Sequence, residues 1–251
     1  MRRRLIAGNW KMYMTPQETE AFIASFLDRI SGSEKVEILL IPPYTSLERA
    51  ARLLERTTVE LGGQDLYFEE SGAYTGAVSG EMIRASGCRY VLAGHSERRH
   101  VFGDDDATVA RKLRAALTAD LLPILCVGEV LEERKAGRTD AVVASQLEAA
   151  FADVAEAETK RITVAYEPVW AIGTGETATP DQAQEAIAGI RRHLTERFGA
   201  SSAESIRILY GGSVKPENTA DLIAQPDIDG LLVGGASLDP DAFARIVAEA
   251  T

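Results

Sequence analysis

Eight short apolar runs, separated by stretches of helical periodicity, constrain the fold of this 251-residue chain more than any other feature. Most runs are continuously apolar rather than alternating, which is typical of parallel strands covered on the outside by helices. Strands that alternate with amphipathic helices imply parallel β–α–β units, and eight of them favour a closed barrel over an open sheet. The predicted strands are Leu5 to Asn9, Val36 to Ile41, Val59 to Gly62, Tyr90 to Ala93, Pro123 to Val127, Ile162 to Tyr166, Ile206 to Tyr210 and Gly230 to Val233. The sequence therefore predicts the α/β class and one (β/α)8 barrel domain spanning residues 1–251.

Helix starts are marked by capping residues followed by proline, which favours the first position of a helix. The three clearest are Thr15-Pro16, with Glu18 completing a capping box, Thr179-Pro180 and Asp239-Pro240. They predict helices after the first, sixth and eighth strands.

Charge and cysteine usage limit the partners and the compartment. A formal net charge of −11 argues against nucleic acid or an anionic membrane as a partner, because clustered Lys and Arg hold both. An anionic small substrate would need a local positive site. No apolar run approaches the ~18 residues of a membrane span. Cys88 and Cys126 lie outside any CxxC or CxxH spacing, so we predict a cytoplasmic protein without a metal site, with Cys126 as a buried thiol.

The stretch AYEPVWAIGTGETATP, residues 165–180, brings a carboxylate to the end of a strand and continues into a segment resembling a lid. Pro168 restricts Glu167 to an extended conformation, which gives its carboxylate a defined position. Gly173 and Gly175 permit unusual backbone conformations, and their N–H groups can approach an anion closely. The same stretch is also compatible with an ordinary loop leading into the helix at Pro180.

Polar residues and glycines follow other predicted strands, and in a β/α barrel the catalytic groups stand at the carboxyl ends of the strands. They are Asn9 and Lys11 on the first strand, His95, Ser96 and Glu97 on the fourth, Ser213 on the seventh, and Gly234 and Gly235 on the eighth. The glycine-rich turns after the last two strands fit an anion site built from backbone N–H groups.

Each of these residues also has a plainer reading when it is taken alone. Asn9 is compatible with a turn, Lys11 with a solvated surface position, and His95 with a structural hydrogen bond. The other two histidines, His100 and His193, are predicted to lie on the surface.

Seven motifs in a fixed order are more specific than any single residue. They are GNWKM, GAYTG, GHSERR, PILCVGE, AYEPVWAIGTG, LYGGSV and GLLVGGASL, spread over nearly the whole chain. Together they closely resemble the triosephosphate isomerase family, whose fold is the TIM barrel. The resemblance implies an aldose–ketose isomerase of glycolysis and gluconeogenesis. Its reaction interconverts dihydroxyacetone phosphate and D-glyceraldehyde 3-phosphate through an enediolate, without a metal or organic cofactor.

The resemblance also implies a catalytic role for five residues. Glu167 is the expected base, and His95 is the expected electrophile and proton shuttle. Lys11 and Asn9 are expected to stabilise the enediolate oxygens, with Glu97 near Lys11. In this family, the standard example of the arrangement, a helix N-terminus keeps the histidine neutral.

Phosphate binding and lid closure follow from the same resemblance. Backbone N–H groups of Gly173, Ser213, Gly234 and Gly235 are expected to hold the phosphate. A lid at residues 168–178 is expected to close over it. The lid and latch residues are Pro168, Trp170, Ile172, Gly175, Ala178, Tyr210 and Glu129. Tyr210 and Ser213 would latch the closed lid to Ala178 and Gly175, and Glu129 would hold Trp170 when the lid is open.

The segment from Gln64 to Ser79 is too long for a simple connection, which indicates a functional or interfacial role. The resemblance implies a homodimer in which this segment enters the neighbouring subunit, with Tyr74, Thr75 and Arg98 at the contact. Ala77 departs from the family's usual glutamate, which would face Arg98 across the interface.

Two further departures are Glu176 in place of the usual lysine, and Asp104 in place of a frequent glutamate. They affect expectations for lid kinetics and interface strength. If Arg98 is buried, another carboxylate such as Asp104 or Glu81 is expected to pair with it.

Two other classes of function remain compatible with the sequence. One is a phosphate-binding barrel that has lost catalysis and acts as a sensor, and the other is a different isomerase or lyase acting on a sugar phosphate. A coupled assay with dihydroxyacetone phosphate discriminates among the three.

Overall fold

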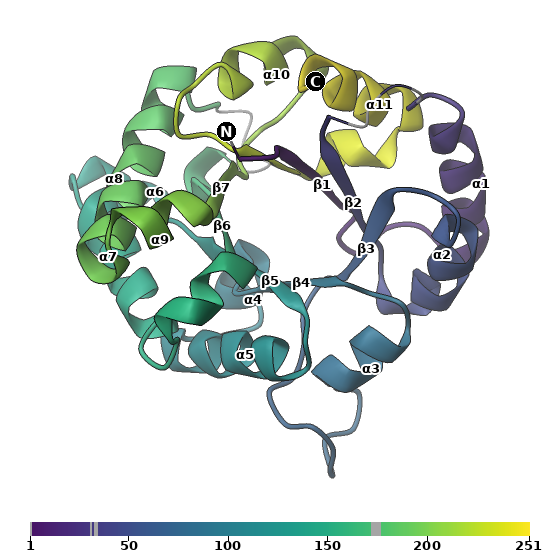
Figure 1. Ribbon diagram of the computed structural model, residues 1–251, viewed down its shortest axis with the longest axis horizontal. Helices are drawn as coiled ribbons and strands as arrows, with labels where there is room; N and C mark the ends of the chain where they lie inside the picture. Colours follow the sequence, from purple (N-terminus) through teal and green to yellow (C-terminus); the bar gives the residue numbers. More distant parts are fainter. Residues whose placement is uncertain (1, 31, 33–34, 172–176) are drawn as a thin grey trace.

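The computed structural model describes residues 2–30, 32, 35–171 and 177–251. Within these residues, eight parallel strands form a closed barrel in chain order, with the helices arranged around it (Figure 1). The strands are β1 Leu5–Asn9, β2 Glu37–Ile41, β3 Val59–Gly63, β4 Tyr90–Ala93, β5 Leu122–Val127, β6 Thr163–Tyr166, β7 Arg207–Tyr210 and β8 Gly230–Val233. The barrel closes where Leu5 of β1 pairs with Gly230 of β8. This confirms the predicted α/β class and the single TIM barrel.

Side chains alternate between two hydrophobic regions along each strand, as the pleat requires. In β2, Leu39 and Ile41 belong to the cluster inside the barrel. Ile38 and Leu40 belong to the layer between the barrel and the helices. Both sets are buried, and this explains why the strands appear in the sequence as continuous apolar runs.

Eleven α-helices lie within the described residues. They are α1 Pro16–Leu27, α2 Leu47–Leu54, α3 Gly80–Ala85, α4 Ser96–His100, α5 Asp106–Thr118, α6 Leu131–Lys135, α7 Thr139–Ala150, α8 Pro180–Phe198, α9 Ala200–Ser205, α10 Pro216–Ile223 and α11 Pro240–Glu249. Four short 3₁₀ helices accompany them: η1 Tyr44–Ser46, η2 Glu156–Arg161, η3 Val169–Ala171 and η4 Gly235–Leu238.

The predicted helix starts are confirmed. Thr15 caps α1 and forms the capping box with Glu18. Thr179 caps α8, and Asp239 accepts the N–H of Ala242 at the start of α11.

Five strands begin or end one residue away from their predicted bounds, because strand ends follow the hydrogen-bonded ladder rather than apolarity. Val36, Ile162 and Ile206 are buried but precede their strands. Gly63 and Leu122, in contrast, extend β3 and β5 by one residue through pairs with Val91 and Tyr90.

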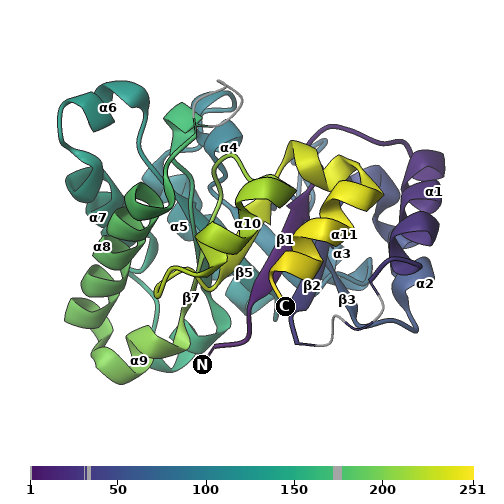
Figure 2. The ribbon, with the colours of Figure 1, turned by 90° about the horizontal axis from the view of Figure 1, so that it is seen from above.

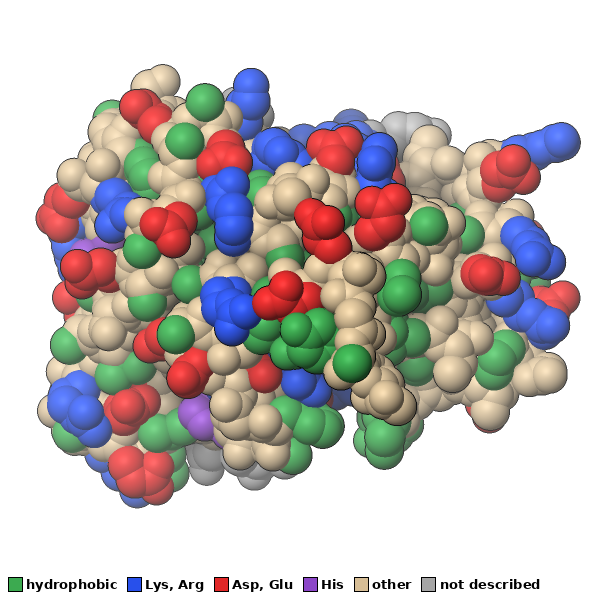
Figure 3. All heavy atoms as spheres, turned by 90° about the horizontal axis from the view of Figure 1, so that it is seen from below, with side chains coloured by type: hydrophobic (Ala, Val, Ile, Leu, Met, Phe, Trp, Pro, Cys, Tyr) green, Lys and Arg blue, Asp and Glu red, His purple; other side chains and the backbone are tan. Residues whose placement is uncertain are grey.

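The segment from Gln64 to Ser79 extends beyond the ring of helices between β3 and α3 (Figure 1). A single bridge between Tyr67 and Ser79 closes its base. Figure 3 views the molecule from the side on which this segment projects, and hydrophobic side chains gather near the middle of that face. Large hydrophobic side chains exposed on the molecule include Met12, Tyr13, Tyr74, Val101 and Phe102.

The two ends of the barrel differ in what they carry. Helices α4 and α6 lie at one end, and the chain termini lie near the other (Figure 2).

Both cysteines are free and buried, including Cys126 as predicted. Among the described residues, no helix is both long and apolar enough to cross a membrane.

Candidate active site

Four of the five residues predicted to be catalytic line one cavity of about 410 Å³ at the carboxyl ends of the strands, and the fifth, Glu97, lines the adjoining cavity. Five different strands contribute to the first cavity: β1, β4, β6, β7 and β8. Its lining includes Asn9, Lys11, His95, Glu167, Ser213, Gly234 and Gly235. Residues far apart in the sequence thus share one site, as barrel geometry dictates.

Glu167 is a buried carboxylate held by donors from the β4–α4 turn. Its Oε2 accepts the backbone N–H of Ser96 at 2.9 Å, and its Oε1 lies 3.0 Å from Nε2 of His95. Burial raises the pKa of Glu167, but His95 and the Ser96 N–H outweigh burial, so the pKa lies below its usual value.

Two glycines make room for Glu167. A Cβ on Gly128 would lie 1.8 Å from the Glu167 carbonyl oxygen, and one on Gly211 would lie 3.0 Å from Glu167 Cγ. Pro168 follows directly, and its carbonyl accepts the N–H of Ala171 as η3 begins. Gly128 after β5 and Gly211 after β7 therefore pack against Glu167 from both sides and fix its position at the end of β6.

His95 is the buried N-cap of α4, and its ring makes contacts on both nitrogens. Nδ1 accepts the backbone N–H of Glu97 at 3.2 Å. Burial lowers the pKa of His95, whereas the carboxylates of Glu167 and Glu97 raise it, with a net upward shift. The charge of Glu167 thus favours the imidazolium, but the Nδ1 contact is possible only with a lone pair on Nδ1. A protonated Nδ1 would face another N–H, so the ring that fits is neutral with its proton on Nε2.

Lys11 sits in a strained backbone conformation with φ of 53°. Its Nζ lies 2.8 Å from Oε1 of Glu97, and Oδ1 of Asn9 accepts its backbone N–H at 3.0 Å. The side chain of Gln64 donates to the Lys11 carbonyl at 2.7 Å and also to the carbonyl of Ile41. Sequence reasoning missed Gln64, although its position as a polar residue directly after β3 was a usable signal.

Ser213, Gly234 and Gly235 line the side of the cavity formed by the last two strands. A Cβ on Gly235 would meet nothing within 4 Å, and one on Gly234 would lie 3.5 Å from Cε of Lys11. An anion there would therefore lie beside both the backbone and the lysine chain. Asn218 supports the turn by donating to the Ser213 carbonyl at 3.0 Å. Gly173, the fourth predicted phosphate ligand, lies outside the described residues.

A second cluster surrounds Glu129, whose carboxylate is fully buried. It accepts the indole N–H of Trp170 at 2.9 Å and the hydroxyl of Tyr166 at 3.1 Å. The guanidinium of Arg134 lies 3.4 Å from Glu129 and 4.6 Å from the centre of the Trp170 ring. This contact between Glu129 and Trp170 is the one that the resemblance assigns to the open lid. Tyr166 and Arg134 were not foreseen, because nothing in the local sequence links them.

Of the other predicted latch residues, Tyr210 and Ala178 are both buried. Burial raises the pKa of Tyr210 to about 12, and the nearby backbone N–H of Ala178 opposes that shift. The two residues are thus neighbours, although the Tyr210 hydroxyl completes no full hydrogen bond among the described residues. Ile172 and Gly175 lie outside the described residues.

The residues predicted for subunit contact do not line this cavity. Tyr74 and Thr75 are exposed on the projecting segment. Arg98 pairs within its own chain with Asp65 at 3.1 Å and Asp104 at 3.3 Å, and its guanidinium stacks on Phe102. The buried Lys112 binds both aspartates.

A second cavity of about 410 Å³ adjoins the active site. It reaches from Lys11 and Glu97 to Ala77 and Arg98.

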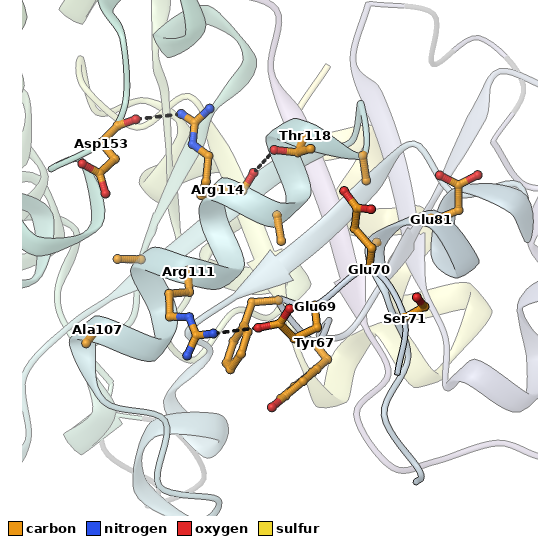
Figure 4. A pocket seen from close by; sticks show the side chains of 15 residues that line it. Tyr67, Glu69, Glu70, Ser71, Glu81, Ala107, Arg111, Arg114, Thr118 and Asp153 are labelled. Atoms are coloured by element: carbon orange, nitrogen blue, oxygen red, sulfur yellow. Dashed lines mark hydrogen bonds and ion pairs between the residues drawn. The ribbon is translucent and has the colours of Figure 1, made fainter. Parts of the chain in front are cut away.

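A larger hollow of about 820 Å³ lies elsewhere, between α5 and residues 67–71 (Figure 4). Its two arginines are engaged: Arg111 pairs with Glu69, and Arg114 donates to the carbonyl of Asp153. Its lining holds none of the residues predicted for chemistry, so size does not identify the site. Within the described ranges, no group of three or more His, Cys, Asp or Glu side chains could hold a metal ion.

Comparison with known proteins gives one consistent family. A family model described as "Triosephosphate isomerase" matches residues 4–250. Proteins named triosephosphate isomerase from Moorella thermoacetica and Symbiobacterium thermophilum are 53% and 52% identical over 247 and 250 residues. These alignments cover 98% and 100% of this chain, and 98% of each relative. A third, from a Roseiflexus species, is 51% identical over 98% of this chain and 97% of its own length.

Proposed function

The chain belongs to the triosephosphate isomerase family, and from this premise we propose that Glu167, His95 and Lys11 carry its proton transfers. The family reaction interconverts dihydroxyacetone phosphate and D-glyceraldehyde 3-phosphate and requires no cofactor. One observation carries the proposal: the Glu167 carboxylate lies 3.0 Å from His95 Nε2 in a cavity that Lys11 also lines.

Glu167 is the proposed base. Its carboxylate takes a proton from the carbon beside the substrate carbonyl and returns it to the neighbouring carbon, which converts one isomer into the other. In the unliganded site, His95 and the Ser96 N–H lower its pKa. A substrate that replaces these donors and excludes water leaves burial as the main influence, which raises the basicity of Glu167.

His95 is the proposed electrophile and proton shuttle. The neutral ring, with its proton on Nε2, can donate to a substrate oxygen and recover a proton from the neighbouring oxygen. The Glu97 N–H at Nδ1 supports this role, because it keeps the proton on the nitrogen that faces the cavity.

Lys11 and Asn9 are proposed to stabilise negative charge on the enediolate oxygens, and Glu97 to orient the Lys11 ammonium. The strained backbone of Lys11 is held in place, so the Lys11 ammonium is already positioned before the substrate binds. The contacts from Asn9 and Gln64 support that interpretation.

Phosphate binding is assigned to backbone N–H groups of Gly173, Ser213, Gly234 and Gly235. The overall charge of −11 repels such a substrate, so the site depends on local donors and the Lys11 charge. A lid at residues 168–178, held open through Trp170 on Glu129 and latched through Tyr210, Ser213, Ala178 and Gly175, is proposed to protect the intermediate.

A homodimer through residues 64–79 is also proposed. The exposed side chains of Met12, Tyr74 and Phe102, together with the cavity beside Lys11 and Arg98, support a second copy as the occupant. Asp65 and Asp104 already neutralise Arg98, so the interface does not require a glutamate at Ala77.

We further infer one domain over residues 1–251. A cytoplasmic location is also inferred, supported by the two free cysteines.

The test is Glu167→Asp, which withdraws the carboxylate by one methylene. A misplacement of ~1 Å costs roughly a hundredfold in rate, so kcat should fall by about that factor. KM should change little because the phosphate contacts remain. The assay couples dihydroxyacetone phosphate consumption to a dehydrogenase specific for the product. Glu185→Asp on the exposed face of α8 makes the same chemical change and should leave kcat unaltered.

Undiminished kcat in Glu167→Asp would remove Glu167 from the role of base. No turnover by the unaltered chain would contradict the function itself.

A further inference from the structure

Arg99 joins three elements around the turn that carries His95. Its Nε donates to the carbonyl of Gly94 at 2.9 Å, and its Nη2 donates to the carbonyl of Cys126 at 3.3 Å. Its Nη1 pairs with Asp106 at 2.6 Å. The side chain is 8% exposed, so this guanidinium is almost wholly withdrawn from water and committed to these acceptors.

The turn beside Arg99 is short and depends on outside support. Helix α4 has five residues, too few for its own hydrogen bonds to hold it rigidly. Gly94 has φ of 73°, a conformation that a side chain would strain. A Cβ there would lie 2.7 Å from Val109 and 3.1 Å from Nη2 of Arg99. A side chain at residue 94 would therefore clash with Val109 and press against the guanidinium of Arg99.

Arg99 is also connected to Glu167, the proposed base, through Cys126. Cys126 is buried inside the barrel on β5, the strand that pairs with β6. Burial raises the pKa of the Cys126 thiol, and the carboxylate of Glu167, which lies against it, raises it further. One planar group therefore ties the residue before His95 to the strand residue beside Glu167.

We propose that Arg99 is a positioning residue that sets the distance between His95 Nε2 and the Glu167 carboxylate. A guanidinium suits this task because its donors have fixed angles, so they define the relative position of two carbonyls. Without Arg99, the start of α4 can rotate about Gly94, and this rotation changes the distance between His95 Nε2 and the Glu167 carboxylate. The proposal rests on the roles assigned above to His95 and Glu167.

The central variant is Arg99→Met, which keeps the aliphatic volume and removes all donors. We expect kcat to fall about tenfold to a hundredfold, with KM within about threefold, because a shift of ~1 Å at the reacting groups costs roughly a hundredfold. The ¹⁵N signals of the His95 ring provide a separate readout. In the unaltered chain, Nδ1 should be pyridine-like and Nε2 pyrrole-like, and in Arg99→Met the two signals should move together as the tautomer loses definition.

Arg161 offers a matched control at the opposite end of the barrel. It donates to two carbonyls, those of Leu117 and Leu121, and pairs with Asp120 at 3.1 Å. Arg161→Met therefore removes the same kinds of contact without touching the site. It should reduce thermal stability but leave kcat and the His95 signals unaltered.

Arg99→Lys serves if Arg99→Met does not fold, since a lysine keeps the charge but reaches fewer acceptors. Unaltered kcat together with unaltered His95 signals in a folded Arg99 variant overturns the proposal. A loss of kcat in Arg99→Met with unaltered His95 signals overturns it as well. His95→Gln, measured in parallel, separates this failure from failure of the proposed function, because full activity in that variant removes His95 itself from catalysis.

Discussion

Each end of the barrel holds a carboxylate withdrawn from water, and the two have different partners: Glu37 is partly buried at the amino end, and Glu167 is buried at the carboxyl end. At the amino end, Glu37 lies 2.7 Å from the guanidinium of Arg207 and accepts the hydroxyl of Tyr90, which also accepts from Arg207 at 2.9 Å. At the carboxyl end, Glu167 faces His95 and a backbone N–H. A guanidinium is a permanent charge, whereas an imidazole and an amide are donors that a ligand can replace.

The pKa values of both carboxylates are lowered, but the consequences for function differ. Burial raises the pKa of Glu37, and Tyr90 and Arg207 outweigh it. No ligand is needed there, so the ion pair stays closed and serves the fold. In the proposed mechanism the substrate replaces the partners of Glu167, so the basicity of Glu167 depends on what occupies the cavity. On the roles proposed above, the character of the partner separates the structural carboxylate from the reactive one.

The largest expected effect is on catalysis at the carboxyl end. His95→Gln keeps a donor near Glu167 but removes proton shuttling, so kcat should fall roughly a hundredfold to ten-thousandfold. Chemical denaturation should show nearly unchanged stability. A large loss of stability would erase the contrast between the two ends.

The complementary change is Arg207→Met at the amino end. It leaves the partly buried Glu37 with the Tyr90 hydroxyl and, at 4.0 Å, the guanidinium of Arg89. Removing the charged partner of this partly buried carboxylate should cost about 1–3 kcal/mol, which urea denaturation at pH 7 would detect. The kcat of the folded fraction should remain unaltered, and a parallel fall in kcat would mean that this end also tunes the site.

The lid gives a smaller test of how the carboxyl end excludes water. Replacing residues 172–175 by a shorter link should slow isomerisation by roughly tenfold, equivalent to ~1.4 kcal/mol of barrier. More methylglyoxal should form per turnover, because the exposed intermediate can expel phosphate. Product analysis by chromatography measures this partition, and an unchanged partition would exclude a shielding role.

The pH dependence of stability sharpens the comparison further. A carboxylate whose pKa is lowered on folding stabilises the native state above its unfolded pKa, about 4.3 for glutamate. This contribution is lost as the pH falls through the folded value. The stability difference between the unaltered chain and Glu37→Gln should therefore be constant near neutrality and shrink below about pH 4. A difference that persists at the lowest pH would show that charge does not explain it.

The smallest effect is expected at the proposed subunit contact. Ala77→Glu should change the dimer dissociation free energy by only about 0 to 1 kcal/mol, because Asp65 and Asp104 already pair with Arg98. Sedimentation equilibrium at micromolar protein, compared with the unaltered chain, measures this. A much tighter dimer would indicate that Arg98 lacks a sufficient partner, and an active monomer would exclude the dimer.

The sequence alone was sufficient to predict features that depend on neighbouring residues, such as helix caps and strand order. The caps at Thr15 and Thr179 depend on neighbours three residues away, and the strand order follows from repetition. Contacts between distant residues were out of reach wherever the family resemblance did not imply them. Glu37 and Arg207 are 170 residues apart, and their pairing depends on barrel closure and register rather than on any local pattern. The same holds for Gln64 beside Lys11, at a separation of 53 residues.

Closure of the barrel has a consequence for how the chain is made. Gly230 approaches Leu5 so closely that a Cβ would lie 2.0 Å from the Leu5 carbonyl, and this seam joins residues 225 positions apart in the sequence. A nascent chain on the ribosome therefore keeps one edge of β1 unpaired until β8 has emerged. Long-range closure of this kind is slow and exposes apolar surface to aggregation. Because Gly234 and Gly235 directly follow the last strand and line the cavity, the barrel and the cavity are completed in the same late step.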